Sequence, residues 1–221
     1  MDTYFTGHIG FSLTPEARAV ASRPETAAAE WLDIFESFDG RVTLRGVYLT
    51  QGFRADTDLF LFMYSRDTRN LQELQLALRK TALGRQMRQP WAFIGITLEA
   101  EFNRSHIPAF VRGLPPKSYL CFYPYIRTPE WYLLPADERR RMLAEHGMFG
   151  REFPGIQTNN VYSFGLGDYE WLLSFETDDL EALVRMVRRQ REAQARAYTK
   201  HEWPFIVGRR VALAEAMQSL L

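Results

Sequence analysis

The sequence predicts an α+β fold built from two similar units, and three observations lead to this prediction. Short segments with the alternating or continuous apolar pattern of strands are interleaved with longer segments of helical periodicity. A strand-like segment followed by a helical one occurs in each half of the chain with matching residues. The 221 residues, 46% of them hydrophobic, are enough for one large core or two small ones.

In the N-terminal half, turn and capping residues separate the expected elements. Thr14 followed by Pro15 is typical of a helix start. Asp39-Gly40 ends a later helix. The continuous apolar run at residues 59–64 predicts a strand that is covered on both faces. The other predicted strands are residues 8–13, 42–50 and 92–102, and the predicted helices are residues 25–38 and 70–83.

The C-terminal half repeats this pattern. Its predicted strands are residues 119–126, 161–165 and 171–175, and its predicted helices are residues 136–148 and 178–197. The segment 56–61 lines up with 168–173, and the same offset places Asp67 on Asp179 and Leu71 on Leu183. A duplicated α+β unit explains this match, and the alternative is coincidence between two amphipathic hairpins. Two such sheets can pair edge to edge and close toward a barrel. We predict one unit over residues 1–104 and a second over 105–221.

Composition excludes several classes of protein. Lys+Arg and Asp+Glu are both 27, so nothing predicts binding to nucleic acid or to a membrane surface. The single cysteine, Cys121, rules out an intrachain disulfide and a cysteine zinc cage. The first ten residues lack the pattern of a secretory signal, and the apolar stretch 92–98 is too short to span a bilayer. These features predict a cytoplasmic protein.

Common catalytic motifs are absent from the sequence. It contains no GxxxxGK[ST], GxGxxG, GxSxG or HExxH, and the four histidines lack the spacing of a zinc-ligand pair. Gly165-Leu166-Gly167 is a bare GxG that precedes a strand, which is the wrong context for a dinucleotide turn. Hydrolase, kinase and dehydrogenase functions are therefore not indicated.

Aromatic side chains concentrate between residues 106 and 146, where two of the four histidines also lie. Tyr119, Cys121, Tyr123 and Tyr125 share one face of a predicted strand. Each buried phenol needs a hydrogen-bond partner, so three of them on one face suit the wall of a pocket. A barrel wall whose hydroxyls reach its rim explains the pattern equally well.

His146 lies on the apolar face of the predicted helix 136–148, since Met142 and Leu143 are four and three residues before it. A lone histidine on such a face is usually a core residue. Its place near a helix C-terminus favours protonation. A large apolar cofactor that needs one axial nitrogen, such as haem, is the functional alternative.

Four separated blocks resemble the chlorite dismutase-like superfamily, and within it the coproheme decarboxylases that carry a distal histidine. The blocks are YPYIR at 123–127, WYLLP at 131–135, EHGM at 145–148 and GDYEW at 167–171. The resemblance covers residues 105–209 and implies two ferredoxin-like units that form a dimeric α+β barrel within one chain. It also implies a homopentamer.

The resemblance assigns roles residue by residue. His146 matches the proximal iron ligand, Tyr123 the redox-active tyrosine and His106 the distal histidine. Three further positions match residues beside the porphyrin propionates: Arg127, Arg196 and Trp131.

Two positions depart from the chlorite dismutases. Asn159, which the resemblance assigns to the cofactor-binding residues, replaces the distal arginine, so the group that stabilises the chlorite anion is missing and decarboxylation is favoured. Gln194 replaces a glutamate that hydrogen-bonds to the proximal histidine, which would make His146 a weaker electron donor to iron.

The resemblance implies iron coproporphyrin III as substrate, hydrogen peroxide as oxidant and haem b as product. His146 would bind the iron, and neutral His106 would take a proton from peroxide. A Tyr123 phenoxyl radical would then abstract hydrogen from a propionate, and carbon dioxide would leave. Two propionates would react in turn, while Arg127 and Arg196 hold the others.

Three alternatives compete with this function. The first is a chlorite dismutase or a haem peroxidase on the same scaffold. The second is a non-enzymatic haem-binding protein, which would need His146 but neither Tyr123 nor His106. The third is an α+β protein without haem. The decarboxylase reading also predicts transient contact with a ferrochelatase.

Overall fold

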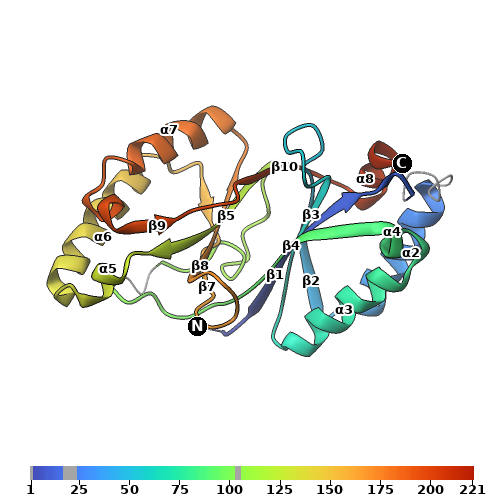
Figure 1. The fold of residues 1–221 in the computed structure, drawn as a ribbon, viewed down its shortest axis with the longest axis horizontal. Helices are drawn as coiled ribbons and strands as arrows, with labels where there is room; N and C mark the ends of the chain where they lie inside the picture. Colours follow the sequence, from blue (N-terminus) through green and yellow to red (C-terminus); the bar gives the residue numbers. More distant parts are fainter. Residues whose placement is uncertain (1, 17–23, 103–105) are drawn as a thin grey trace. The chain divides into compact units, whose positions relative to one another are not determined.

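The computed structural model describes residues 2–16, 24–102 and 106–221, which form two compact units of mixed α+β structure (Figure 1). We name the two units by their place along the sequence. The inner unit comprises residues 98–205, and the outer unit comprises the flanking residues 2–97 and 206–221. The predicted α+β class is confirmed.

The outer unit is built on an antiparallel sheet with the strand order β4-β1-β3-β2-β10. The strands are β1 (Phe5–Leu13), β2 (Val42–Leu49), β3 (Leu59–Ser65), β4 (Met87–Ile96) and β10 (Ile206–Val211). β3 lies at the centre, and its residues 59–63 are completely buried. The prediction from its continuous apolar run is therefore confirmed.

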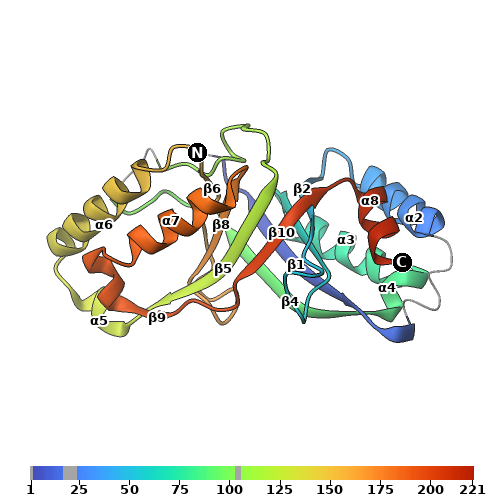
Figure 2. The same cartoon turned by 90° about the horizontal axis from the view of Figure 1, so that it is seen from above.

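The helices of the outer unit are α2 (Pro24–Ser37), α3 (Thr68–Lys80), α4 (Ala82–Gln86) and α8 (Leu213–Leu220). Figures 1 and 2 place α2, α3 and α8 on one side of the sheet. Leu71, Leu74 and Leu78 of α3 recur at helical spacing and are buried against that sheet. Burial of each such side chain stabilises the fold by about 2 kcal/mol.

The C-terminal residues join the outer unit, which differs from the predicted division into 1–104 and 105–221. β10 pairs with β2, so that Val211 faces Val47. α8 buries Ala216 and Met217 in the same core as Trp31. The predicted boundary between residues 104 and 105 lies outside the described residues.

The inner unit has β5 (Tyr119–Arg127) between β8 (Trp171–Thr177) and β9 (Thr199–His201). The short strands β6 (Gln157–Thr158) and β7 (Val161–Tyr162) both pair with β8. Its helices are α5 (Pro129–Leu133), α6 (Ala136–Arg151), α7 (Leu180–Gln190) and the 3-10 helix η1 (Gln194–Tyr198). Figures 1 and 2 place α6 and α7 on the same side of β5 and β8.

The two units repeat one strand pairing in the same register. Phe5 of β1 faces Ser65 of β3, and Tyr119 of β5 faces Thr177 of β8. Each pair of strands is followed by a helix with an aspartate N-cap, at Asp67 in α3 and Asp179 in α7. The aligned positions noted in the sequence therefore occupy equivalent places.

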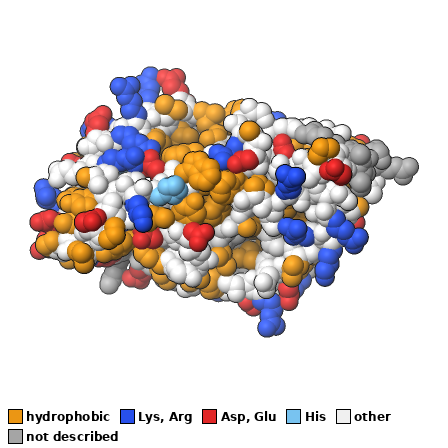
Figure 3. All heavy atoms as spheres, in the orientation of Figure 1, with side chains coloured by type: hydrophobic (Ala, Val, Ile, Leu, Met, Phe, Trp, Pro, Cys, Tyr) orange, Lys and Arg blue, Asp and Glu red, His pale blue; other side chains and the backbone are white. Residues whose placement is uncertain are grey.

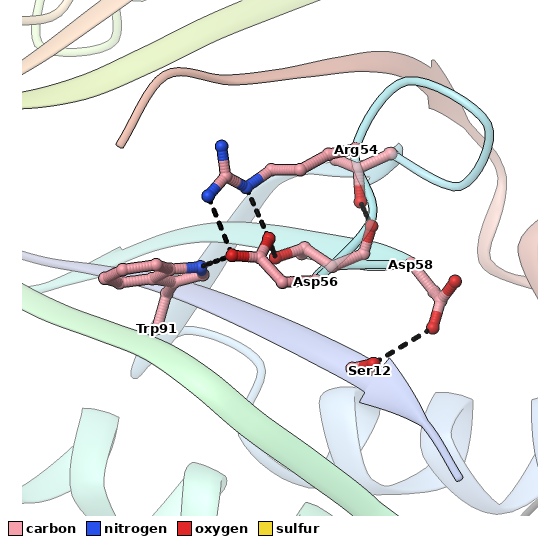
Figure 4. Close-up of polar contacts among 7 residues, drawn as sticks. Ser12, Arg54, Asp56, Asp58 and Trp91 are labelled. Atoms are coloured by element: carbon pink, nitrogen blue, oxygen red, sulfur yellow. Dashed lines mark hydrogen bonds and ion pairs between the residues drawn. The ribbon is translucent and has the colours of Figure 1, made fainter. Parts of the chain in front are cut away.

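One acidic side chain repeats as well. In the outer unit, Asp58 accepts a hydrogen bond from the backbone N–H of Leu13 at 2.7 Å. It also accepts one from the Ser12 hydroxyl at 3.3 Å (Figure 4). In the inner unit, Glu170 accepts from the backbone N–H of Arg127 at 2.7 Å. Both carboxylates thus fix the last residue of the first strand of their unit.

Figure 4 also shows how the loop between β2 and β3 is held. The Asp56 carboxylate accepts from Nη2 of Arg54 at 2.7 Å and from the Trp91 indole at 3.3 Å. The loop is thereby fastened to β4.

Some predicted boundaries differ from the structure. The strand expected at residues 92–102 runs over Met87–Ile96, and the helix expected at 178–197 ends at Gln190. The helix start at Thr14 leads into residues 17–23, which lie outside the described residues.

Acidic and basic side chains are interspersed on the face drawn in Figure 3, in keeping with their equal numbers. Within the described residues, none of the helices combines the length and apolar character that a membrane span requires.

We predict that His8 makes the outer unit sensitive to acid. Its ring is completely buried and stacks on Phe62 at 4.4 Å between ring centroids, and burial lowers its pKa to about 3. The unfolded chain binds the proton with a pKa of about 6.5, so stability falls as pH decreases from 6.5 toward 3. Between pH 7 and pH 5, the free energy of unfolding should fall in both proteins. The fall should be about 2 kcal/mol smaller in His8→Phe than in the unchanged chain.

Urea unfolding at the two pH values measures this difference. His201→Phe is the control, because His201 is exposed. Equal losses in the unchanged chain and in His8→Phe would contradict the prediction.

Candidate functional site

The site residues predicted from the sequence all lie in the inner unit, where they are spread over several elements. Tyr123 and Arg127 lie on β5, and Trp131 lies on α5. His146 lies on α6, Arg196 lies on η1, and His106 lies in the segment before β5. The folded inner unit brings several of these side chains within electrostatic reach of one another.

His146 has an imidazole that is neutral at physiological pH. Desolvation lowers its pKa to about 4, and the positive charge of Arg127 and the neighbouring His106 imidazole act in the same direction. The residue is nevertheless exposed to solvent. Among the described residues, no group hydrogen-bonds to either ring nitrogen. The helix dipole was expected to favour protonation, but α6 continues to Arg151 and desolvation shifts the pKa of His146 downward instead.

His106 is also exposed, and it lies near enough to His146 for their charges to interact. Desolvation and then the positive charge of Arg112 lower the pKa of His106. Its side chain is therefore a neutral base at physiological pH.

Tyr123 is buried on β5, with only 8% of the residue exposed. Its ring stacks on Phe205 at 4.3 Å and on Phe175 at 5.8 Å between centroids. Burial raises the pKa of the phenol, which therefore stays protonated. Within the described part of the chain, no group hydrogen-bonds to its hydroxyl. The phenol is thus held by ring packing alone.

Arg127 is held firmly on three sides. Its guanidinium lies over the rings of Trp131 at 4.2 Å and Tyr125 at 4.9 Å. Its Nη1 donates to the carbonyl of Ala195 at 2.6 Å. Trp131 is itself buried against Met142 and Ala195. Trp131 therefore packs in the core of the inner unit and also supports the Arg127 guanidinium.

Arg196 shares a carboxylate with a second arginine. Its Nη1 donates to Oε2 of Glu202 at 2.6 Å, and Nη1 of Arg191 donates to the same oxygen at 2.7 Å. The Glu202 side chain is only 15% exposed. Glu202 therefore fixes the direction in which Arg196 presents its remaining donors.

Asn159 is completely buried, and both ends of its amide are used within the protein. Its Oδ1 accepts from the backbone N–H of Phe110 at 2.8 Å. Its Nδ2 donates to Glu176 at 3.2 Å. Asn159 thus fastens the segment that follows His106 to β8.

Gln194 bonds to the neighbour of His146 instead of to His146. Its backbone N–H and its Nε2 donate to the Glu145 carboxylate at 2.7 and 3.2 Å. The backbone carbonyl of His146 accepts from Nε2 of Gln190 at 3.2 Å. These bonds join α6 to α7 and η1.

Sequence reasoning missed the two acidic residues that hold the arginines. Glu170 stands within a recognised block, but its contact with the Arg127 backbone follows only from the fold. Glu202 lies outside the recognised blocks, and a local charge pattern does not reveal its two partners.

The outer unit does not repeat the site. In the equivalent register, Ile9 takes the place of Tyr123 and Leu13 takes the place of Arg127. Both apolar side chains pack against the core that contains Trp31. These polar residues are thus present in only one of the two units at the equivalent positions.

The donor set fits a metal that arrives within a porphyrin. Over the described residues, no cluster of three or more His, Cys, Asp and Glu side chains could form a metal cage. One neutral histidine suffices when a porphyrin supplies the equatorial nitrogens. Arg127 and Arg196 provide guanidinium groups that suit the carboxylates of such a ligand.

Comparisons with known proteins show which family the chain resembles. The family described as chlorite dismutase matches residues 24–211. A coproheme decarboxylase from Mycolicibacterium smegmatis is 43% identical over 183 residues, which are 82% of this chain and 79% of that protein.

Solved structures of similar fold include a mutant of the chlorite dismutase from Candidatus Nitrospira defluvii and the same enzyme in complex with imidazole. Each has a TM-score of 0.89 and 18% identity, and each match covers 98% of this chain and 94% of the other. At this identity the likeness is evidence for the fold alone.

Proposed function

Because the chain belongs to the chlorite dismutase family, we propose that it is a coproheme decarboxylase. The substrate is iron coproporphyrin III, the oxidant is hydrogen peroxide, and the product is haem b. The 43% identity to a coproheme decarboxylase supports this reaction class.

One structural observation carries the proposal. His146 presents a neutral imidazole to which no described group hydrogen-bonds, and it lies within electrostatic reach of Arg127 and His106. Neutral imidazole is the form that binds iron. In the proposal, His146 binds the iron of the substrate, while Arg127 and Arg196 hold propionates that do not react. Each charge-assisted pair contributes roughly 1.5–3 kcal/mol.

His106 and Tyr123 perform the two proton-coupled steps. His106 accepts a proton from peroxide, since its lowered pKa keeps it neutral. Tyr123 is oxidised and then takes a hydrogen atom from the β-carbon of a propionate. For each group, one propionate, one peroxide and one proton give a vinyl group, carbon dioxide and two waters. Two such rounds yield haem b.

Asn159 supports decarboxylation over chlorite chemistry. Its amide is buried and bonded to Phe110 and Glu176, so it offers no positive group to a chlorite anion. Asn159 was expected from the sequence to bind the cofactor, but both ends of its amide are engaged within the protein, so its part in the proposal is to position the segment that carries His106.

The resemblance also supports five finer proposals. The two units are each ferredoxin-like, and the chain assembles as a homopentamer. It acts in the cytoplasm and receives its porphyrin through transient contact with a ferrochelatase. Trp131 lies beside the reacting propionates and supports Arg127.

Anaerobic titration with ferric coproheme, followed by stepwise addition of peroxide, tests the function. Mass spectrometry of the porphyrin should record the loss of two carboxyl groups in succession, ending in haem b. Tight binding with bleaching alone would leave a haem-binding protein or a peroxidase. No binding would exclude the proposal altogether.

His146→Ala tests the iron ligand. We expect coproheme to bind at least about tenfold more weakly, a loss of about 1.4 kcal/mol, because the axial bond is missing. The absorption spectrum should also lose the features of histidine-bound iron. His201→Ala is the matched control, since His201 is an exposed histidine on β9. Unchanged affinity and spectrum in His146→Ala would refute the assignment.

A further inference from the structure

A row of aromatic rings runs from β5 to an exposed tyrosine in the inner unit. The ring of Tyr125 meets Trp171 edge-on, with 5.9 Å between centroids. Trp171 in turn stacks on Tyr132 at 6.3 Å with only 7° between the ring planes. Tyr132 is 38% exposed. Tyr125 lies two residues beyond Tyr123 on the same face of the strand.

The Tyr132 hydroxyl differs from its neighbours in having a carboxylate as partner. It donates to Oε2 of Glu170 at 2.6 Å. The hydroxyl of Tyr125 pairs with the hydroxyl of Thr199, and that of Tyr162, which also lies beside Trp171, donates to a backbone carbonyl. A carboxylate can accept a proton completely, whereas a carbonyl cannot.

This bond is an addition to the shared framework of the two units. Glu170 fixes the backbone N–H of Arg127 just as Asp58 fixes that of Leu13, so this contact belongs to the fold. The second partner of Asp58 is the hydroxyl of Ser12, which cannot be oxidised by one electron under the same conditions as a phenol. In the outer unit, Asp58 therefore holds the end of the strand without any counterpart of the Tyr132–Glu170 hydrogen bond.

We propose that Tyr132 is a second oxidisable site, where one-electron donors such as small phenols are oxidised at the protein surface. The inference rests on the proposed function, because peroxide activated at the bound haem supplies the oxidising equivalents.

The electron and proton movements balance. Reduction of peroxide to two waters takes up two electrons and two protons. An electron leaves Tyr132 through Trp171 and Tyr125, and the phenolic proton moves to Glu170. An external phenol then returns an electron, Glu170 returns the proton, and the phenol releases its own proton. Two such cycles convert one peroxide and two phenols into two waters and two phenoxyl radicals.

The two tyrosines are suited to different tasks. An oxidised tyrosine is a strong acid, so the carboxylate at 2.6 Å stabilises the oxidised state of Tyr132. Tyr123 lacks such a base among the described residues and is buried at 8% exposure. An oxidising equivalent at Tyr123 therefore stays reactive toward a substrate hydrogen, whereas one at Tyr132 is trapped where external donors can reach it.

Spin trapping on the chain loaded with haem b tests the proposal, because haem b carries no propionate that this reaction removes. After peroxide addition, peptide mass spectrometry should locate the trap on Tyr132. Tyr132→Phe keeps the ring stack and should lose both this adduct and most of the oxidation of 2-methoxyphenol. Tyr162→Phe is the matched control and should keep both.

Coproheme decarboxylation is measured in the same proteins and should be unchanged in Tyr132→Phe. If the trap reports on Tyr123 or other residues but never on Tyr132, the inference is overturned. The same holds if phenol oxidation is equal in Tyr132→Phe and the unchanged chain. If decarboxylation remains active while one of these two results is found, only the inference about Tyr132 is overturned. If the chain fails to bind porphyrin, the proposed function is overturned as well.

Discussion

Tyr123→Phe should bind coproheme normally and fail to decarboxylate it. The phenylalanine ring can keep the stacking contacts with Phe205 and Phe175. Since no described group hydrogen-bonds to the hydroxyl, its removal leaves no protein partner unsatisfied. The phenolic O–H is nevertheless the bond that the proposed radical step uses. Haem b formation should therefore fall by about 10³-fold or more, equivalent to about 4 kcal/mol of transition-state stabilisation.

The measurement separates binding from chemistry. Coproheme affinity is determined by absorption titration, and product formation by mass spectrometry after each addition of peroxide. Tyr119→Phe is the control, because Tyr119 lies on the same face of β5. Haem b formation at the normal rate in Tyr123→Phe would show that another residue abstracts the hydrogen.

The repeated part of the fold was predictable because its signals are local. β3 and β8 are apolar runs, and α3 and α7 begin at aspartate N-caps that the sequence alignment of the two halves already paired. Hydrophobic period and capping chemistry determine such elements within a short window.

The elements that sequence reasoning missed depend on distant partners. β10 contains two arginines and gives no clear strand pattern, yet it pairs with β2 across most of the chain. α7 ends at Gln190 although no glycine or proline marks the end there. The following residues form η1, which is held by Glu145 through Gln194. Contacts of this kind become visible only once the chain is folded.

In the candidate site, too, some features could be predicted from the sequence and others depend on contacts between distant residues. Residue roles for His146, Tyr123 and His106 came from resemblance, while their environments came from the structure. The helix-dipole argument predicted a readily protonated His146, but desolvation and the nearby Arg127 charge lower its pKa. A local rule failed because the dominant energies arise from residues far apart in sequence.

His106→Ala should slow the reaction with peroxide and leave porphyrin affinity intact. Loss of a general base typically costs about 10²–10⁴-fold in rate. The base is active only when neutral, so the rate for the unchanged chain should fall as pH decreases through the pKa of His106. Desolvation and the charge of Arg112 lower that pKa, which places the fall below the ordinary histidine value of about 6.5. The variant should lack this acid-dependent step.

Arg112→Ala provides the matched test, because it changes the pKa of His106 without removing the imidazole. Loss of the nearby positive charge makes protonation easier, so the acid-dependent step should move to higher pH. Stopped-flow measurement of the peroxide reaction from pH 4.5 to 8 compares the three proteins. An acid-dependent step that persists unchanged in His106→Ala would assign it to another group. A step that stays in place in Arg112→Ala would show that desolvation alone sets the pKa of His106.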